Sequence, residues 1–486
     1  FLVRAAQRAS RSGAPSRAVQ LYARAAAIAP PEWSPALYEE AANAAAEAGE
    51  HEEMAAHARL AREGHVRVDS SRGAARARAL EGTALRFLEQ HGIARGLLEE
   101  SLVVLREDPD VATVRALRHL AAVEHGIGNV VTGVRLITEA LELAQAIGVG
   151  TSDLALLFNS RGALAATTSR LAEAACDYRA SAHLAERAGD YGALALAQGN
   201  LADVLVQSDP KAAADVARSA VAHARRAGNK DHLSLAFGNL AVALTELGEW
   251  DEAVALARDG VEVDQLEHMY LLGVRGELAA LRGDRAVAAA AQESVARYRG
   301  SEDVQSQSIL GLLDATAALC TGDSAGALAL ALGVLERAEA AGIGTDSVRW
   351  AWPLAARAAR SLGERAVRDD LRAMLDAHPT GHLPPILRAE RTLEDALAAF
   401  DDAGPGATPG ARAVADAVEG LRRVGNPYQL AHGLVDLAEI QGRAGEDGAD
   451  AALAEAREIA ERLGCLPLLA RADAVATKYA PSGARS

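Results

Sequence analysis

One segment of this chain occurs twice, 39 residues apart, and this repeat limits the fold more than any other feature of the sequence. Residues 189–205 and 228–244 carry the same residue type at nine of seventeen positions. In the second copy these positions are Gly228, Leu233, Leu235, Ala236, Gly238, Asn239, Leu240, Ala241 and Leu244. A shorter third copy includes Gly425, Asn426, Leu430, Leu437 and Ala438. Periods of this length are typical of stacked supersecondary units.

Each repeated unit is predicted to form two helices. Apolar residues recur at steps of three and four from Leu233 to Leu244, which places them along one face of a helix. Gly248 suits the left-handed conformation that ends many helices. Asp251 and Glu252 then favour the positive end of the next helix dipole. The second helix carries its own apolar stripe at Ala253, Val254, Ala257 and Val261.

The unit resembles the tetratricopeptide repeat (TPR). The family pattern is met in order by Phe237, Asn239, Leu240, Ala241, Leu244, Gly248, Trp250 and Ala253. The resemblance implies an all-α, right-handed solenoid in which the first helix of every hairpin lines a concave groove. At about 35–40 residues per hairpin, the chain holds about twelve or thirteen hairpins.

Composition agrees with this prediction. Ala makes up about a quarter of the 486 residues, and aromatic residues only 3%. Ala favours helix and close packing, whereas a β-sandwich or barrel needs more β-branched and aromatic residues. Helix breaks are predicted near Gly49, Gly64, Gly92, Gly128, Gly148, Gly150, Gly189, Gly228, Gly248, Gly283, Gly322, Gly342, Gly363, Gly425, Gly445 and Gly464.

Two Pro- and Gly-rich stretches, His378 to Pro385 and Asp401 to Gly410, are predicted to be loops. We therefore expect a TPR-like array over 1–380, with a hinge near residue 380. An interrupted helix and loop follow over 381–410, then C-terminal TPR-like repeats over 411–480. Residues 481–486 are expected to be a disordered tail.

Charge and cysteine content restrict the partners and the compartment. The formal net charge of −16 disfavours nucleic-acid binding. No apolar run is long enough to span a membrane. The widely spaced Cys176, Cys320 and Cys465 suit a reducing cytoplasm and offer no zinc site.

Motifs for catalysis are missing from the sequence. It has no phosphate-binding Gly-Lys-Ser/Thr loop, HExxH, CxxC or Gly-x-Ser-x-Gly pattern. Ser208 and Lys211 match Ser-x-x-Lys, but they fall in a predicted turn between helices. His378 and His382 are four residues apart, yet Pro379 opposes the helix that would align them on a metal. We expect no enzyme activity, cofactor or metal in this segment.

Asn159, Asn200 and Asn239 are candidate groove residues, because each lies on a predicted first helix. A ladder of amide side chains can donate to and accept from an extended peptide. Asp436 occupies the same slot in the third copy. The alternative is that these residues only hold neighbouring repeats together.

Trp350 and Trp352 form a candidate surface hot spot. Residues two apart do not share one face of a helix, so one of the two rings is expected to be exposed. The alternative is that both belong to the core, as most aromatic residues of solenoids do.

The segments 425–438 and 456–469 resemble the closing repeats of large bacterial signalling regulators. In those proteins a signal-transduction ATPase precedes a TPR half. Some also carry an adenylate/guanylate cyclase domain, and LuxR-like members end in a DNA-binding domain. The resemblance implies a non-catalytic scaffold or sensor arm that binds a protein, peptide or small inducer and acts on a neighbouring ATPase domain. Because Phe1 already fits a helical register, we expect a longer natural chain. The alternatives are a stand-alone peptide-binding adaptor and a helical enzyme with an unrecognised pocket.

Overall fold

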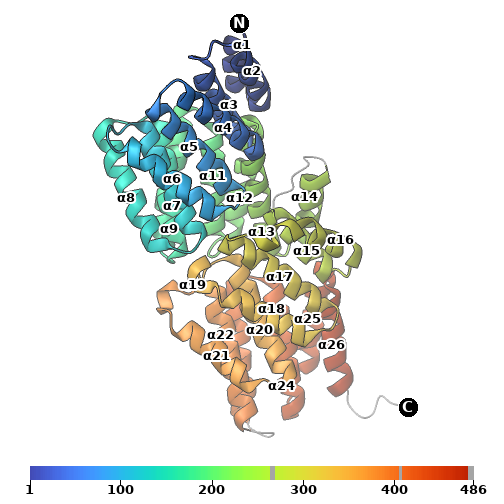
Figure 1. Cartoon of the computed structure of the whole chain (residues 1–486). Coiled ribbons are helices and arrows are strands. Elements are labelled where there is room, and N and C mark those ends of the chain that lie inside the picture. Colours follow the sequence, from blue (N-terminus) through green and yellow to red (C-terminus); the bar gives the residue numbers. More distant parts are fainter. Residues whose placement is uncertain (263–268, 404–407, 480–486) are drawn as a thin grey trace. The chain divides into compact units, whose positions relative to one another are not determined.

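The computed structural model describes residues 1–262, 269–403 and 408–479, and within these ranges it contains helices and no strands (Figure 1). The first thirteen α-helices are α1 (Leu2–Arg11), α2 (Pro15–Ile28), α3 (Ser34–Ala48), α4 (His51–Arg67), α5 (Ser71–Phe87), α6 (His91–Leu105), α7 (Val111–Gly126), α8 (Val130–Ile147), α9 (Thr151–Thr167), α10 (Leu171–Ala188), α11 (Tyr191–Leu205), α12 (Pro210–Ala227) and α13 (Lys230–Leu247).

The remaining helices follow one another along the chain in the same way. They are α14 (Trp250–Glu262), α15 (Met269–Leu281), α16 (Arg285–Val295), α17 (Val304–Cys320), α18 (Ser324–Leu335), α19 (Ala338–Ala341), α20 (Asp346–Leu362), α21 (Arg365–Asp376), α22 (Pro385–Ala403), α23 (Thr408–Val424), α24 (Pro427–Ala444), α25 (Ala449–Leu463) and α26 (Leu466–Tyr479). Two short 3-10 helices, η1 (Ala296–Gly300) and η2 (Thr380–His382), lie between them.

The helices group into two compact units. Unit 1 comprises Phe1–Val204, Asp215–Asn239 and Gly300–Gln307. Unit 2 comprises Leu205–Ala214, Leu240–Arg299 and Ser308–Ser486.

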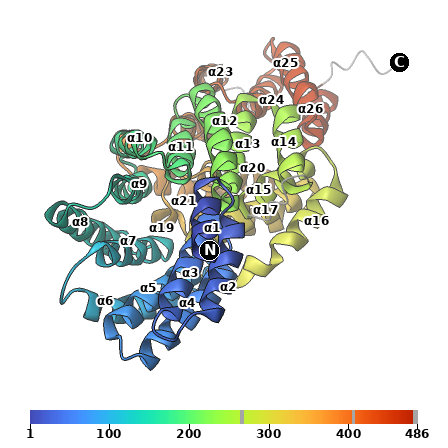
Figure 2. The same ribbon diagram turned by 90° about the horizontal axis from the view of Figure 1, so that it is seen from above.

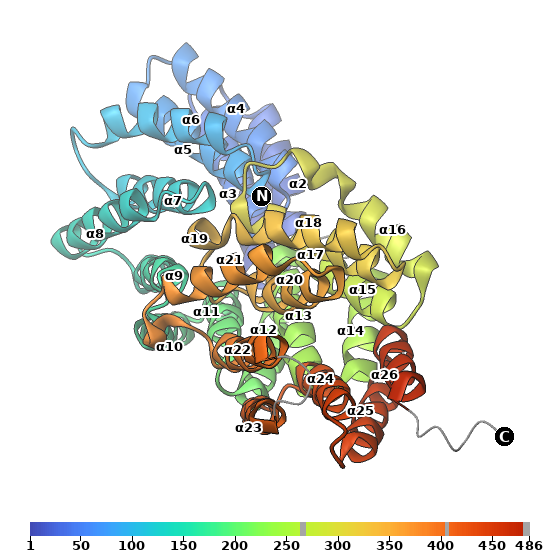
Figure 3. The same ribbon diagram turned by 90° about the horizontal axis from the view of Figure 1, so that it is seen from below.

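Consecutive helices pack as hairpins within each unit. In unit 1, α7 lies beside α8 and α9 beside α10 (Figure 2). In unit 2, α22, α23, α24 and α25 pack in sequence (Figure 3). The repeat segments fall on α11, α13 and α24, each of which opens a hairpin. The paired-helix prediction is therefore confirmed.

The loop at residues 378–385 lies inside unit 2 and does not separate the two units. Arg357 of α20 donates to Glu390 of α22 at 2.6 Å, across this loop. Arg368 of α21 likewise pairs with Glu394 of α22 at 2.9 Å. These contacts attach α22 to the helices before the loop. The domain boundaries expected from the Pro-rich stretches stay predictions. A hinge near residue 380 stays a prediction.

Of the second loop, residues 404–407 lie outside the described residues, and its flanks are helical in α22 and α23. The predicted disordered tail, 481–486, also lies outside the described residues.

Most predicted helix breaks are confirmed by glycines with positive φ, but near Gly64 and Gly92 the breaks lie a few residues away from the glycine itself. Gly64 lies inside α4, where a Cβ atom would come within 2.7 Å of the Pro35 side chain. It therefore allows α3 and α4 to approach closely. The turn after α4 is made by Asp69 (φ 56°), and the turn before Gly92 by Glu89 (φ 57°). Polar non-glycine residues can adopt this conformation at a cost, so a search for glycine misses such turns.

None of the helices that the structure describes is long and apolar enough to cross a lipid bilayer.

Gly276 of α15 tests how tightly the helices are packed. A Cβ atom at this position would lie 2.6 Å from Leu313 Cδ1 and 2.9 Å from Ala291 Cβ. Gly276→Ala should lower the melting temperature in calorimetry, because overpacking costs about 1–3 kcal/mol. Gly96→Ala in α6 is the matched control, since no atom lies within 4 Å of its Cβ position. It should raise stability by about 0.5–1 kcal/mol through helix propensity alone. Equal effects of the two substitutions would contradict the packing argument.

Candidate binding site

The predicted Asn ladder lies in unit 1, where the structure brings its members together. Asn200 Nδ2 donates to Asn159 Oδ1 at 3.0 Å, linking α11 to α9. Asn239 Nδ2 donates to the Gly199 carbonyl at 2.7 Å, linking α13 to α11. Asn159 and Asn239 are buried. These contacts support the packing alternative, and ligand binding by the three amides stays a prediction.

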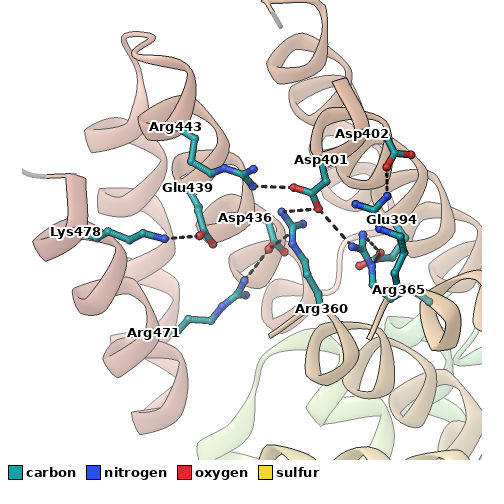
Figure 4. Close-up of polar contacts among 11 residues, drawn as sticks. Arg360, Arg365, Glu394, Asp401, Asp402, Asp436, Glu439, Arg443, Arg471 and Lys478 are labelled. Carbon is teal, nitrogen blue, oxygen red and sulfur yellow. Dashed lines mark hydrogen bonds and ion pairs between the residues drawn. The ribbon is translucent and has the colours of Figure 1, made fainter. Parts of the chain in front are cut away.

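Asp436 of α24 is buried in an ion-pair network (Figure 4). Its Oδ1 accepts from Arg471 Nη2 at 2.7 Å and lies 3.8 Å from Arg360 Nη1. Burial alone would raise the pKa of Asp436, but Arg471, Arg360 and Arg357 hold it below its ordinary value. The carboxylate is therefore ionised and already paired within unit 2.

The two predicted tryptophans have different environments. Trp352 is completely buried, and its Nε1 donates to the Leu371 carbonyl at 3.0 Å. It is therefore a core residue and not part of a surface hot spot. Trp350 is half-buried, its Nε1 donates to Glu246 at 3.2 Å, and its ring stacks on Tyr428 at 5.1 Å. Two contacts thus fix the orientation of this indole.

Trp350 lines a pocket in unit 2 of about 480 Å³, counting the part open to solvent. The walls come from α13, α15, α17 and α20, which each open a hairpin. In the TPR arrangement such helices line the groove, so the pocket lies where the resemblance predicts a binding surface. Its lining residues are Val242, Thr245, Tyr270, Val274, Glu277, Leu278, Leu281, Ile309, Leu312, Asp346, Ser347 and Trp350.

The pocket is acidic because two of its carboxyl groups lack a cationic partner among the described residues. Glu277 of α15 makes no hydrogen bond or ion pair within that part of the chain. Burial, and then the nearby Asp346, raise the pKa of Glu277 well above its ordinary value of 4.5. Among the described residues, Asp346 accepts a hydrogen bond from the Ser347 backbone N–H alone, at 3.0 Å.

Glu246, beside the pocket, is held differently. It accepts from the Trp350 indole, lies 3.5 Å from Arg349 Nη1 and accepts from the Asn426 amide. All of these partners belong to unit 2. Glu246 therefore orients Trp350 and is already neutralised by Arg349, which leaves Glu277 and Asp346 to meet a ligand.

This arrangement fits the binding of a cation. An ammonium or guanidinium group is attracted both to carboxylates and to the face of an indole. Sequence reasoning found Trp350 but missed Glu277 and Asp346. The available signal was an acidic residue inside the mostly apolar segment Met269–Leu281, whose other charged residue is Arg275.

The structure offers little support for other chemistry at this site. Within the described ranges, no group of three or more His, Cys, Asp or Glu side chains could hold a metal ion. Burial raises the pKa of the Cys320 thiol to about 11 and that of Cys465 to about 12. Both thiols are therefore protonated and poor nucleophiles at neutral pH.

Comparison with known proteins gives a fold and no family. No family model matches the chain, and no curated protein matches it. A solved structure of a Rap protein complexed with competence and sporulation factor is similar, with 12% identity and a TM-score of 0.52. The match covers 70% of this chain and 97% of that one. A monomeric IFIT1 mutant with m7Gppp-AAAA matches at 11% identity and a TM-score of 0.42, over 80% of this chain and 90% of that one. The chain has the fold of an all-α solenoid of TPR-like helical hairpins.

Asn239 provides a test of the packing role. Asn239→Ala removes the 2.7 Å hydrogen bond between α13 and α11 and leaves a small void. We expect a loss of about 1–3 kcal/mol, seen as a lower melting temperature of the ligand-free protein. Asn129→Ala is the comparison variant, because the Asn129 amide donates to Glu124, only five residues earlier in the chain, and does not link two hairpins. It should lower the melting temperature less than Asn239→Ala does. An unchanged melting temperature for Asn239→Ala would favour the groove-ligand role instead.

Proposed function

We propose that this chain is a non-catalytic binding scaffold, and that the pocket of unit 2 anchors a positively charged group of a protein or peptide ligand. The observation that carries the proposal is the unpartnered Glu277 carboxyl group beside the fixed ring of Trp350. A guanidinium or ammonium group entering there would be the cationic partner that Glu277 lacks, and it would contact the face of the Trp350 indole at the same time.

The position of the pocket favours the insertion of one side chain of a longer ligand. Because several first helices form its walls, a chain lying along them could insert one residue. The similar solved structure of a Rap protein holds a bound factor, which supports a ligand-binding role for this kind of solenoid.

A labelled hexapeptide library with one fixed position tests the proposal. Peptides with Arg or Lys at the fixed position should bind the wild-type chain with higher affinity than peptides with a neutral residue there, as measured by fluorescence anisotropy. Glu277→Gln should weaken that binding at least tenfold, because removing one partner of a desolvated charge pair costs about 2–5 kcal/mol. Trp350→Leu should weaken it at least tenfold as well, because a desolvated contact between a cation and an indole contributes about 2 kcal/mol.

Trp33→Leu is the matched control, because this Trp is 69% exposed and lies in unit 1. It should leave binding unchanged. Equal binding of basic and neutral peptides by the wild-type chain would contradict a cation-binding pocket.

The raised pKa of Glu277 predicts a pH dependence. A cationic ligand favours the ionised carboxylate, so binding must release a proton while the free group is protonated. Affinity should therefore rise with pH, by up to about tenfold per unit, until the pH exceeds the raised pKa. Titration calorimetry in buffers of different ionisation enthalpy would measure the proton release. Glu277→Gln should remove both effects, and a pH-independent wild-type affinity would count against Glu277 as the partner.

We also propose that the scaffold is the sensor arm of a larger bacterial regulator and acts on a neighbouring ATPase domain. Some of the regulators that it resembles also carry a cyclase domain. The support is the resemblance of segments 425–438 and 456–469 to such proteins. ATP hydrolysis by the full-length gene product should change when a pocket-binding peptide is added and should not respond in Trp350→Leu. A gene product without an ATPase domain would favour the stand-alone adaptor.

A further inference from the structure

A second group of side chains without partners lies in unit 1, and its charge is positive. Arg86, near the end of α5, stacks its guanidinium on the ring of Phe87, with Cζ 3.7 Å from the ring centroid. The ring of His51 also stacks on Phe87, at 4.2 Å and an interplanar angle of 5°. The guanidinium makes no hydrogen bond to a described residue, and its Nε is buried. Stacking therefore holds Arg86 flat and leaves the N–H groups at its edge unused.

Two side chains of α7 add further unused donors. Arg118 Nη2 lies 2.7 Å from His119 Nε2 and donates to it, so the proton of the neutral imidazole is on Nδ1. That Nδ1 is buried and has no partner in the described part of the chain. The His119 ring lies 6.4 Å from the Phe87 ring, which places it next to Arg86.

The pKa directions of these three groups agree with their burial and with their closeness to one another. Burial, and then Arg86, lower the pKa of Arg118 to about 9. Burial lowers the pKa of Arg86 to about 10. Burial, Arg118 and Arg86 lower the pKa of His119 well below its ordinary value, so its ring is neutral at pH 7. Like charges gathered without an anion are unfavourable, and a bound anion would relieve that cost.

The nearby carboxylates are already engaged. Asp153 accepts two hydrogen bonds from Arg115, at 2.6 and 3.1 Å. Asp231 pairs with His51, and Asp303 lies 3.4 Å from His91. These acids attract Arg86 and Arg118 only at longer range. They also make the surroundings unfavourable for a doubly charged anion.

We propose that Arg86, Arg118 and His119 form a binding site for a carboxylate group of a ligand. Helices α5 and α7 each open a hairpin, so in the TPR arrangement both face the groove. All three side chains are partly exposed and can be reached from solvent. A carboxylate has two oxygens in one plane, which match the fork of the flat Arg86 guanidinium, and Arg118 and His119 supply further donors. Its single negative charge balances the cations without strong repulsion from Asp153, Asp231 and Asp303.

Saturation-transfer NMR on the full chain, with acetate as the probe, tests this site. Wild-type protein should give a saturable acetate signal at pH 7.5, and neutral acetamide should give none. Arg86→Gln and Arg118→Gln should each weaken acetate binding at least tenfold. Arg86→Lys keeps the charge but loses the fork, so it should weaken binding by a smaller factor.

Arg179→Gln is the matched control, because Arg179 is exposed on α10 and the substitution changes the net charge equally. It should bind acetate like the wild type. Arg118→Gln removes the hydrogen bond to His119 but no ion pair, so the melting temperature of the ligand-free variant should fall only slightly. An acetate signal that persists in both Gln variants, or displacement by inorganic phosphate at a tenfold lower concentration than acetate requires, would overturn the proposal.

Discussion

The close approach of helices is the constraint on which the rest of this structure depends. At Gly162 an added Cβ atom would lie 2.8 Å from the Tyr178 ring, and at Gly433 it would lie 2.7 Å from Leu421. Ala is the most frequent residue of the buried core, where it packs beside Leu, Val and Ile. Interfaces built from Ala and aliphatic side chains need few aromatic rings, which explains why a chain with 3% aromatic residues can bury its helices. It also means that Arg and Glu side chains must lie on the groove side, at the rims, or in pairs between helices.

Ion pairs within hairpins and between them follow from this constraint. Arg161 of α9 makes two hydrogen bonds to Asp177 of α10 in the same hairpin, and Arg422 of α23 pairs with Glu455 of α25 in the next hairpin. In unit 2 the pairs around Asp401 and Asp436 connect several helices (Figure 4). Because nearly every cation in these interfaces has an acid beside it, the exceptions carry information. Glu277 is an acid without a cation, and Arg86 and Arg118 are cations without an acid in the described part of the chain.

The sequence predicted the fold well because the fold depends on local patterns. The apolar stripe of residues 233–244, the turn at Gly248 and the 39-residue period each act within one hairpin, and the structure confirms them. The candidate site was only partly predictable, since it depends on which side chains meet across hairpins. Trp350 and Glu277 are more than 70 residues apart, and no repeat pattern states that α15 and α20 share a pocket. Asn239, a candidate groove residue, makes the packing contact that was the alternative, and ligand binding by its amide stays a prediction.

Net charge is a poor guide to ligands for the same reason. A formal charge of −16 describes the whole surface, but most of the acids that compose it face water or a paired arginine. What a site attracts is decided by the few charges that are partly buried and unpaired, since screening by solvent and salt is weakest there. By that criterion the pocket beside Trp350 selects cations and the Arg86 cluster selects anions, although both belong to one acidic chain. A ligand with both kinds of charge is therefore not required, and each site has to be tested by the substitution of its own residues.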